Sequence, residues 1–209
     1  KGKITVKNAM RPVVVETTSG SINVDFRDVD NNSLRNSILS GETELTQLDI
    51  FIINKYLSYL EGEKIEKVNG EDVVTYDKIE SLVVTTESGP VTVNNIINSI
   101  KITAQSSLIT LNYKHVRNTS DIKTSSKDVI IKAPVENFKI TTKMNKTSTS
   151  KLELKFAGIK MNAYSDELSD PTRMKKYNED EFKCLDARIG NASDSTNNII
   201  TITDFTGKI

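Results

Sequence analysis

Histidine, cysteine, tryptophan and glycine are scarce: the 209 residues include one His, one Cys, no Trp and nine Gly. The single cysteine, Cys184, excludes an internal disulfide framework, and we interpret it as a small buried apolar residue. With His115 as the only histidine, the chain has too few soft ligands for a zinc site. A Ser/His or Cys/His catalytic pair would have to use the same residue, which we interpret as a surface histidine at a strand end. The dispersed glycines form no phosphate loop, and we expect no cofactor.

An excess of one charge is also lacking, because Lys and Arg number 28 and Asp and Glu number 28. Proteins that bind nucleic acid normally carry a basic stripe, so we expect no nucleic-acid partner. No run approaches the roughly 18 apolar residues that cross a bilayer, and no signal peptide is present. The chain begins with Lys1 rather than Met, so we expect a processed or excised segment whose membrane anchor lies outside this sequence.

What the sequence does contain is an internal repeat. Val13–Val24, VVVETTSGSINV, aligns with Leu82–Val93, LVVTTESGPVTV, and each copy has the pattern of a strand, a Ser-Gly turn and a second strand. Further copies, which become looser along the chain, are Thr103–Asn112, Ser126–Lys132, Lys151–Phe156 and Asn198–Thr203. Units with strand character thus return about every 18 to 23 residues through the middle of the chain.

A unit of this size cannot bury its apolar face alone, whereas parallel stacking of such units buries a continuous core. We therefore predict a mainly β chain, residues 1–209, folded as one domain of β-solenoid or β-helix-like stacked repeats. The alternative is an antiparallel β-sandwich, because short strands with frequent turns suit that fold as well.

Residues 34–78 interrupt the repeat. Apolar residues at three- and four-residue steps predict an amphipathic helix over about 43–61, which Gly62 ends. Asn69-Gly70 between two alternating runs predicts a β-hairpin over 64–76, because both residues tolerate the positive φ of a type I′ turn. This insertion is the candidate binding element, since insertions on a repeat scaffold commonly carry binding.

The helix of this insertion has more apolar residues than one packed face needs. They either bind a partner protein or cover an edge of the β-sheets that would otherwise aggregate. The candidate partner-binding residues are Phe51, Ile53, Tyr56, Leu57, Tyr59 and Leu60.

A second interruption covers about 164–188. Asp170 as a cap and Pro171 at the first helical position predict a short helix to about Tyr177. The charged run 178–181 then predicts a loop or a turn.

Acidic residues suggest two further activities, and both have simpler explanations. The segment 25–32 could offer oxygen ligands to calcium, but Ser33 and Leu39 stand where an EF-hand needs Gly and Glu. Paired carboxylates near 25–30 or 179–181 could cleave a glycosidic bond. However, clefts that process sugars are usually lined with aromatic residues, and Phe, Trp and Tyr make up 6% of this chain. A polysaccharide-acting β-helix enzyme is therefore the least favoured hypothesis.

The paired units Val13–Val24 and Leu82–Val93 resemble the adhesin-type β-strand repeats of bacterial envelope proteins, particularly those of Firmicutes. The resemblance implies a repetitive β fold displayed outside the cytoplasmic membrane, often behind an N-terminal anchor, and it implies no catalytic residue. The resulting hypothesis is a non-catalytic, extracytoplasmic adhesin-like or scaffold domain that binds a protein or a cell-envelope component. The alternative is a sensor or regulatory domain that binds a protein partner through residues 34–78.

Overall fold

The computed structural model describes residues 2–27, 63–76, 78–125, 129–134, 136–145, 174–193 and 195–204. These residues are mainly β and include no helix. The strands are β1 (Ile4–Ala9), β2 (Val13–Ser19), β3 (Ile22–Phe26), β4 (Glu63–Val68), β5 (Glu71–Tyr76), β6 (Leu82–Ser88), β7 (Val91–Ile96), β8 (Ile100–Ser106), β9 (Ile109–Tyr113), β10 (Thr119–Thr124), β11 (Val129–Lys132), β12 (Phe138–Asn145), β13 (Met174–Glu179), β14 (Phe182–Ile189) and β15 (Ile199–Asp204).

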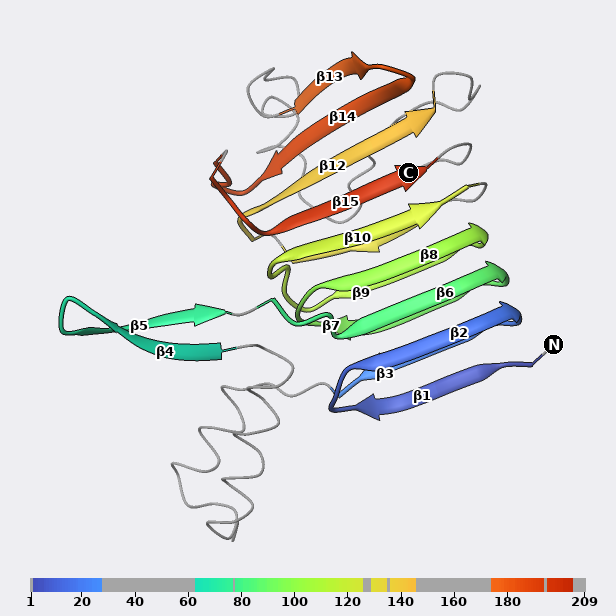
Figure 1. Cartoon of the computed structure of the whole chain (residues 1–209), viewed down its shortest axis with the longest axis horizontal. Coiled ribbons are helices and arrows are strands. Elements are labelled where there is room, and N and C mark those ends of the chain that lie inside the picture. Colours follow the sequence, from blue (N-terminus) through green and yellow to red (C-terminus); the bar gives the residue numbers. More distant parts are fainter. Residues whose placement is uncertain are drawn as a thin grey trace, which may run out of the picture.

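Two sheets lie one on the other, and a separate hairpin projects from them (Figure 1). The five-stranded sheet has the order β1-β3-β7-β9-β11, and all its strand pairs are parallel. The eight-stranded sheet has the order β13-β14-β12-β15-β10-β8-β6-β2 and is mixed, because β14 runs antiparallel to both β12 and β13. The hairpin consists of β4 and β5, which pair with each other.

The strand register follows the sequence repeat residue by residue. Val13 pairs with Leu82, and Leu82 pairs with Ile100, so the two copies recognised in the sequence lie side by side in one sheet. The second strands of the same units pair in the other sheet, where Val91 is opposite Ile109. The strands of the repeat therefore pair in parallel, rather than in the antiparallel manner that a sandwich of this sequence would require.

Alternation along the strands places the core between the two sheets. In β8 and β12, for example, buried residues alternate with partly or fully exposed ones. Branched aliphatic side chains of both sheets form one buried cluster, in which Ile102, Ile109, Leu111 and Ile202 are 0% exposed. Because the parallel partners are in register, each inward row joins the same kind of side chain from strand to strand.

Glycines make the turns between the paired strands possible. Gly20 and Gly89 have φ angles of 122° and 108°, which side chains rarely adopt. A Cβ atom on Gly89 would lie 2.2 Å from the carbonyl oxygen of Gly20, and one on Gly20 would lie 1.9 Å from that of Gly2. The Ser-Gly pair in both sequence copies thus reflects two turns stacked in direct contact, the first of which also lies against the backbone of Gly2.

Polar ladders accompany the strands at equivalent positions. Asn94 donates its amide to Asp25, and Asn112 donates to the side-chain oxygen of Asn94 at 2.5 Å. At another corner the Asn118 amide donates to Asn98 Oδ1 at 3.1 Å. In such a ladder a polar side chain finds its hydrogen-bond partner at the equivalent position of the neighbouring unit. This favours pairing of the units in the same register.

The hairpin prediction is confirmed, and the prediction of the second insertion is partly wrong. β4 and β5 meet at Asn69 and Gly70, whose φ angles are 55° and 88°. The predicted helix over 43–61 and the repeat copy over 151–156 lie outside the described residues. The short helix predicted to reach Tyr177 is wrong from Met174 onward, because these residues form β13 and pair antiparallel with β14. The turn expected in 178–181 is present at Asp180, where φ is 47°.

Candidate binding surface

The outward side of the eight-stranded sheet is the broadest surface that the described strands present. Its residues alternate with the buried ones, and the register aligns them in two rows across β2, β6, β8, β10, β15 and β12. The first row is Val14, Val83, Lys101, Asp121, Thr201 and Thr141, and the second is Glu16, Thr85, Thr103, Lys123, Thr203 and Lys143. We call these twelve residues the outer face.

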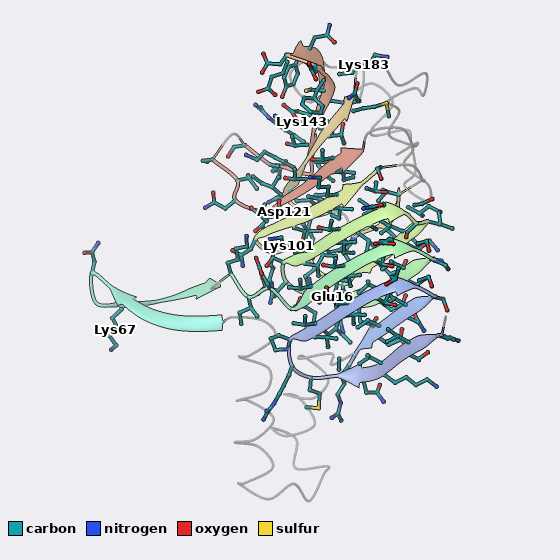
Figure 2. All side chains as sticks on the ribbon, turned by 45° about the vertical axis from the view of Figure 1, so that its right-hand side comes forward. Glu16, Lys67, Lys101, Asp121, Lys143 and Lys183 are labelled. Carbon is teal, nitrogen blue, oxygen red and sulfur yellow. The ribbon has the colours of Figure 1, made fainter. Side chains whose placement is uncertain are left out.

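The outer face combines hydroxyl groups with charges of both signs. Its side chains are exposed or half-buried, and Val14 on the edge strand β2 is 76% exposed. Lys101 and Asp121 are opposite each other on β8 and β10, so opposite charges are neighbours. Figure 2 labels these two residues together with Glu16 on β2 and Lys143 on β12. Adjacent strands repeat at about 4.8 Å, so the face offers regularly spaced polar groups on a rigid support.

The outward side of the five-stranded sheet differs in chemistry. Its amide side chains bond to one another, as the Asp25–Asn94–Asn112 ladder shows. Thr92 and Thr110, paired in register on β7 and β9, lie beside this ladder and are half-buried. Since its amides are partly used in internal contacts, this side has fewer groups for a partner than the outer face has.

The β4–β5 hairpin is the part of the 34–78 insertion that the structure describes. It extends sideways from the two sheets, and neither strand joins them (Figure 1). Lys67 near its tip is exposed (Figure 2). An isolated two-stranded hairpin is marginally stable in water, so a projecting one is suited to gain order from contact with another molecule.

The six apolar residues predicted to bind a partner belong to the helix part of the same insertion. Phe51, Ile53, Tyr56, Leu57, Tyr59 and Leu60 all lie outside the described residues. Their proposed role therefore stays a prediction.

A small titratable cluster lies where β12, β13 and β14 adjoin. Lys143 Nζ is 2.7 Å from Glu179 Oε2, and the Lys143 hydrogen bond lowers the pKa of that carboxyl. Cys184 is 1% exposed, and its Sγ is 3.9 Å from the same oxygen. Burial, and then the Glu179 charge, raise the pKa of the thiol. A thiol in this environment stays protonated, the opposite of an activated nucleophile. The interpretation of Cys184 as a small buried residue is confirmed.

His115 follows β9, as predicted for a histidine at a strand end. Its Nδ1 is 2.6 Å from Glu136 Oε1, and the second carboxylate oxygen accepts the Val116 backbone N–H at 3.1 Å. Glu136 thereby joins the turn after β9 to the segment before β12. These two contacts of Glu136 support the corner of the fold.

Two of the acidic residues considered for calcium or glycoside chemistry, Asp25 and Glu179, lie on different sheets. Asp25 accepts the Asn94 amide on the five-stranded sheet, whereas Glu179 pairs with Lys143 on the eight-stranded one. Asp28 and Asp30 lie outside the described residues. In the part of the chain that is described, no three His, Cys, Asp or Glu side chains are grouped to hold a metal ion.

The described residues also contain no helix of the length and apolarity that spanning a membrane requires. Comparisons with family models, curated proteins and solved structures each return no match.

Sequence reasoning pointed to the insertion and did not single out the outer face. A signal for the outer face was present, because the repeat alignment already set Thr85 against Thr103. The Lys143–Glu179 pair carried no such signal, since it depends on how β12 and the β13–β14 hairpin meet.

Proposed function

We propose that this chain is a non-catalytic, adhesin-like or scaffold domain of the cell envelope, built as a β-solenoid, which binds a protein or envelope component through its outer face. The observation that carries the proposal is the register of the repeats. Residues at equivalent positions pair in parallel across β2, β6, β8 and β10, so outward side chains form continuous rows.

A surface of this kind suits binding by many weak contacts. The strands fix the positions of the side chains, so little conformational entropy is lost when a partner binds. Threonine hydroxyls both donate and accept hydrogen bonds, and the alternating Lys and Asp or Glu charges select a partner with a complementary pattern. The resemblance of Val13–Val24 and Leu82–Val93 to adhesin-type repeats agrees with display outside the membrane and with anchoring by a segment outside this sequence.

The test is retention of envelope material by the immobilised chain. In one variant Thr85→Glu and Thr103→Glu introduce charge at the centre of the outer face, where the two residues are register partners. The matched control carries Thr92→Glu and Thr110→Glu, which are register partners on the other sheet. Each double variant places two like charges opposite each other, so their costs in stability are similar.

We expect the Thr85/Thr103 variant to lose at least about tenfold in retention, equivalent to about 1.4 kcal/mol. The Thr92/Thr110 variant should retain the material as the parent chain does. Equal retention by both variants would contradict binding through the outer face. A protease-protection assay on intact cells tests the location, because an extracytoplasmic domain is cleaved without lysis.

The second candidate is a sensor or regulatory domain that binds a protein partner through the 34–78 insertion. The projection of the β4–β5 hairpin away from both sheets favours it (Figure 1). Replacing Glu63–Tyr76 with a short Gly/Ser linker removes the hairpin and no strand of either sheet. If this variant folds by circular dichroism and loses retention while the Thr85/Thr103 variant keeps it, the insertion is the binding element and the sensor hypothesis replaces the first.

A further inference from the structure

Strand β15 occupies an unexpected position, between β10 and β12 of the eight-stranded sheet. It is parallel to both: Thr201 pairs with Asp121 on one side and with Thr141 on the other. Ile200 and Ile202 are fully buried there. A strand from the end of the described chain thus separates two strands that follow each other in the repeat.

The residue numbers of the register partners show that β12 follows β10 at the same offset as β10 follows β8. Lys101 and Asp121, paired on adjacent strands β8 and β10, differ by 20 in residue number. Asp121 and Thr141, the two partners of Thr201, also differ by 20, although β15 lies between them. The same length of chain therefore makes a step of one strand in the first case and of two strands in the second. Without β15, β12 would be in register to pair directly with β10.

The five-stranded sheet also indicates that each unit of the repeat adds one strand to each sheet. Each of β2, β6, β8 and β10 is followed in sequence by a strand of the other sheet, namely β3, β7, β9 and β11. In that sheet β11 pairs with β9, in step with the pairing of β10 and β8. Among the described residues, β11 is the edge strand of the five-stranded sheet, and no strand joins it in step with β15.

Asparagine contacts explain why β15 takes this place in the folded chain. Asn198, just before β15, accepts the Asn118 backbone N–H at 3.0 Å and donates its amide to the Asn137 carbonyl at 3.5 Å. Asn118 itself bonds to Asn98, so β15 extends the ladder of asparagines that precede β8 and β10. At the corresponding position β12 has Phe138, which cannot continue it.

We propose that β15 is an inserting strand: β12 first pairs directly with β10, and β15 then enters between them and completes the sheet. The order of synthesis supports this sequence of events, because β10 and β12 emerge from the ribosome before β15. The direct pairing is an intermediate of folding, and it returns when β15 leaves its place.

Pairs of introduced cysteines distinguish the two arrangements in the full chain, with Cys184→Ala as background. Asp121→Cys with Thr201→Cys reports the inserted strand, because these residues are register partners. Asp121→Cys with Thr141→Cys reports the direct pairing: a two-strand separation of about 9.6 Å is too long for a disulfide, whereas adjacent strands at about 4.8 Å permit one. The matched control is Lys101→Cys with Thr201→Cys, which is also separated by one intervening strand and is adjacent in neither arrangement.

During refolding from urea under oxidising conditions, the Asp121/Thr141 pair should cross-link early and the Asp121/Thr201 pair late. The Lys101/Thr201 pair should stay at least about tenfold slower than the Asp121/Thr141 pair, because only the latter becomes adjacent. In the folded chain Asn198→Ala should speed cross-linking of Asp121/Thr141 about tenfold, since it removes the contacts that hold β15. The proposal is overturned if Asp121/Thr141 cross-links no faster than Lys101/Thr201 throughout refolding.

Discussion

Replacing Gly89 with alanine tests the packing of the stacked turns, and the structure indicates a large effect. The added Cβ would lie 2.2 Å from the Gly20 carbonyl oxygen and 2.7 Å from its carbonyl carbon, whereas ordinary contact begins at 3.4 Å. Both atoms belong to the backbone, so the two turns must move apart by roughly 1 Å. The hydrogen bond from Ile22 N to Pro90 O, now 2.9 Å, lies beside this contact and would lengthen. The φ angle of 108° adds strain of about 1–3 kcal/mol for a residue with a side chain. With about 1 kcal/mol for the weakened hydrogen bond, we expect a loss of about 3 kcal/mol in the free energy of unfolding.

The assay is urea unfolding followed by circular dichroism, and Gly70→Ala is the matched control. Gly70 also has a positive φ, 88°, but no atom lies within 4 Å of its Cβ position, and its hairpin joins neither sheet. We expect Gly70→Ala to cost about 1–2 kcal/mol at most, because it has the strain of a positive φ without the backbone contact, and its hairpin can open locally. If Gly89→Ala unfolds within about 0.5 kcal/mol of Gly70→Ala, the turns are not in contact and the reasoning is refuted.

Three further predictions follow from burial. Ile102→Ala should lower the free energy of unfolding by about 2–5 kcal/mol, because the Ile102 side chain is 0% exposed. In the control, Ile130→Ala, the loss should be less than about 1 kcal/mol, because Ile130 is 45% exposed; urea unfolding measures both. Burial raises the pKa of Tyr113 far above its usual value and that of Tyr177 to about 12. The folded chain therefore binds these protons more tightly than the unfolded chain. The associated stability is complete below about pH 10 and declines as the pH rises from there towards the folded-state pKa values. The melting temperature of the parent chain should fall between about pH 9 and 12, and that of Tyr113→Phe should fall less. An equal fall in both would show that Tyr113 does not contribute to the pH dependence. Cys184 is buried and the pKa of its thiol is raised, so a thiol reagent at pH 8 should react at least about a hundredfold more slowly with the folded chain than with the chain in urea. Comparable rates would contradict the buried position of Cys184.

The repeat itself could be predicted to the residue. The alignment of Val13 with Leu82 and that of Thr85 with Thr103 both reappear as register partners, because the same alternation of apolar and polar residues favours the same pairing. The Asn69-Gly70 hairpin was equally predictable, since its signal is local.

The failures occur where the arrangement depends on distant parts of the chain. Asp170 and Pro171 carry a good signal for a helix start, yet antiparallel pairing with β14 makes Met174–Glu179 a strand. The position of β15 is a stronger case, because residues of β12 follow those of β10 at the same offset of 20 that separates β10 from β8, yet β15 lies between β10 and β12. Among the site residues, the rows of the outer face follow from the alternation, but the Lys143–Glu179 contact depends on tertiary structure.

Parallel pairing of successive repeat units underlies the outer face, the glycine turns and the inserted strand alike, so through-space NMR contacts between backbone protons are the most direct test. On a uniformly labelled chain, the account predicts contacts between Val84 and Ile102 and between Val93 and Leu111, which are parallel partners from successive units. An antiparallel sandwich would instead fold β6 against β7 about the Ser88-Gly89 turn and pair Thr85 with Thr92. Contacts of the first kind would establish the stacked repeat, and contacts of the second kind would contradict it.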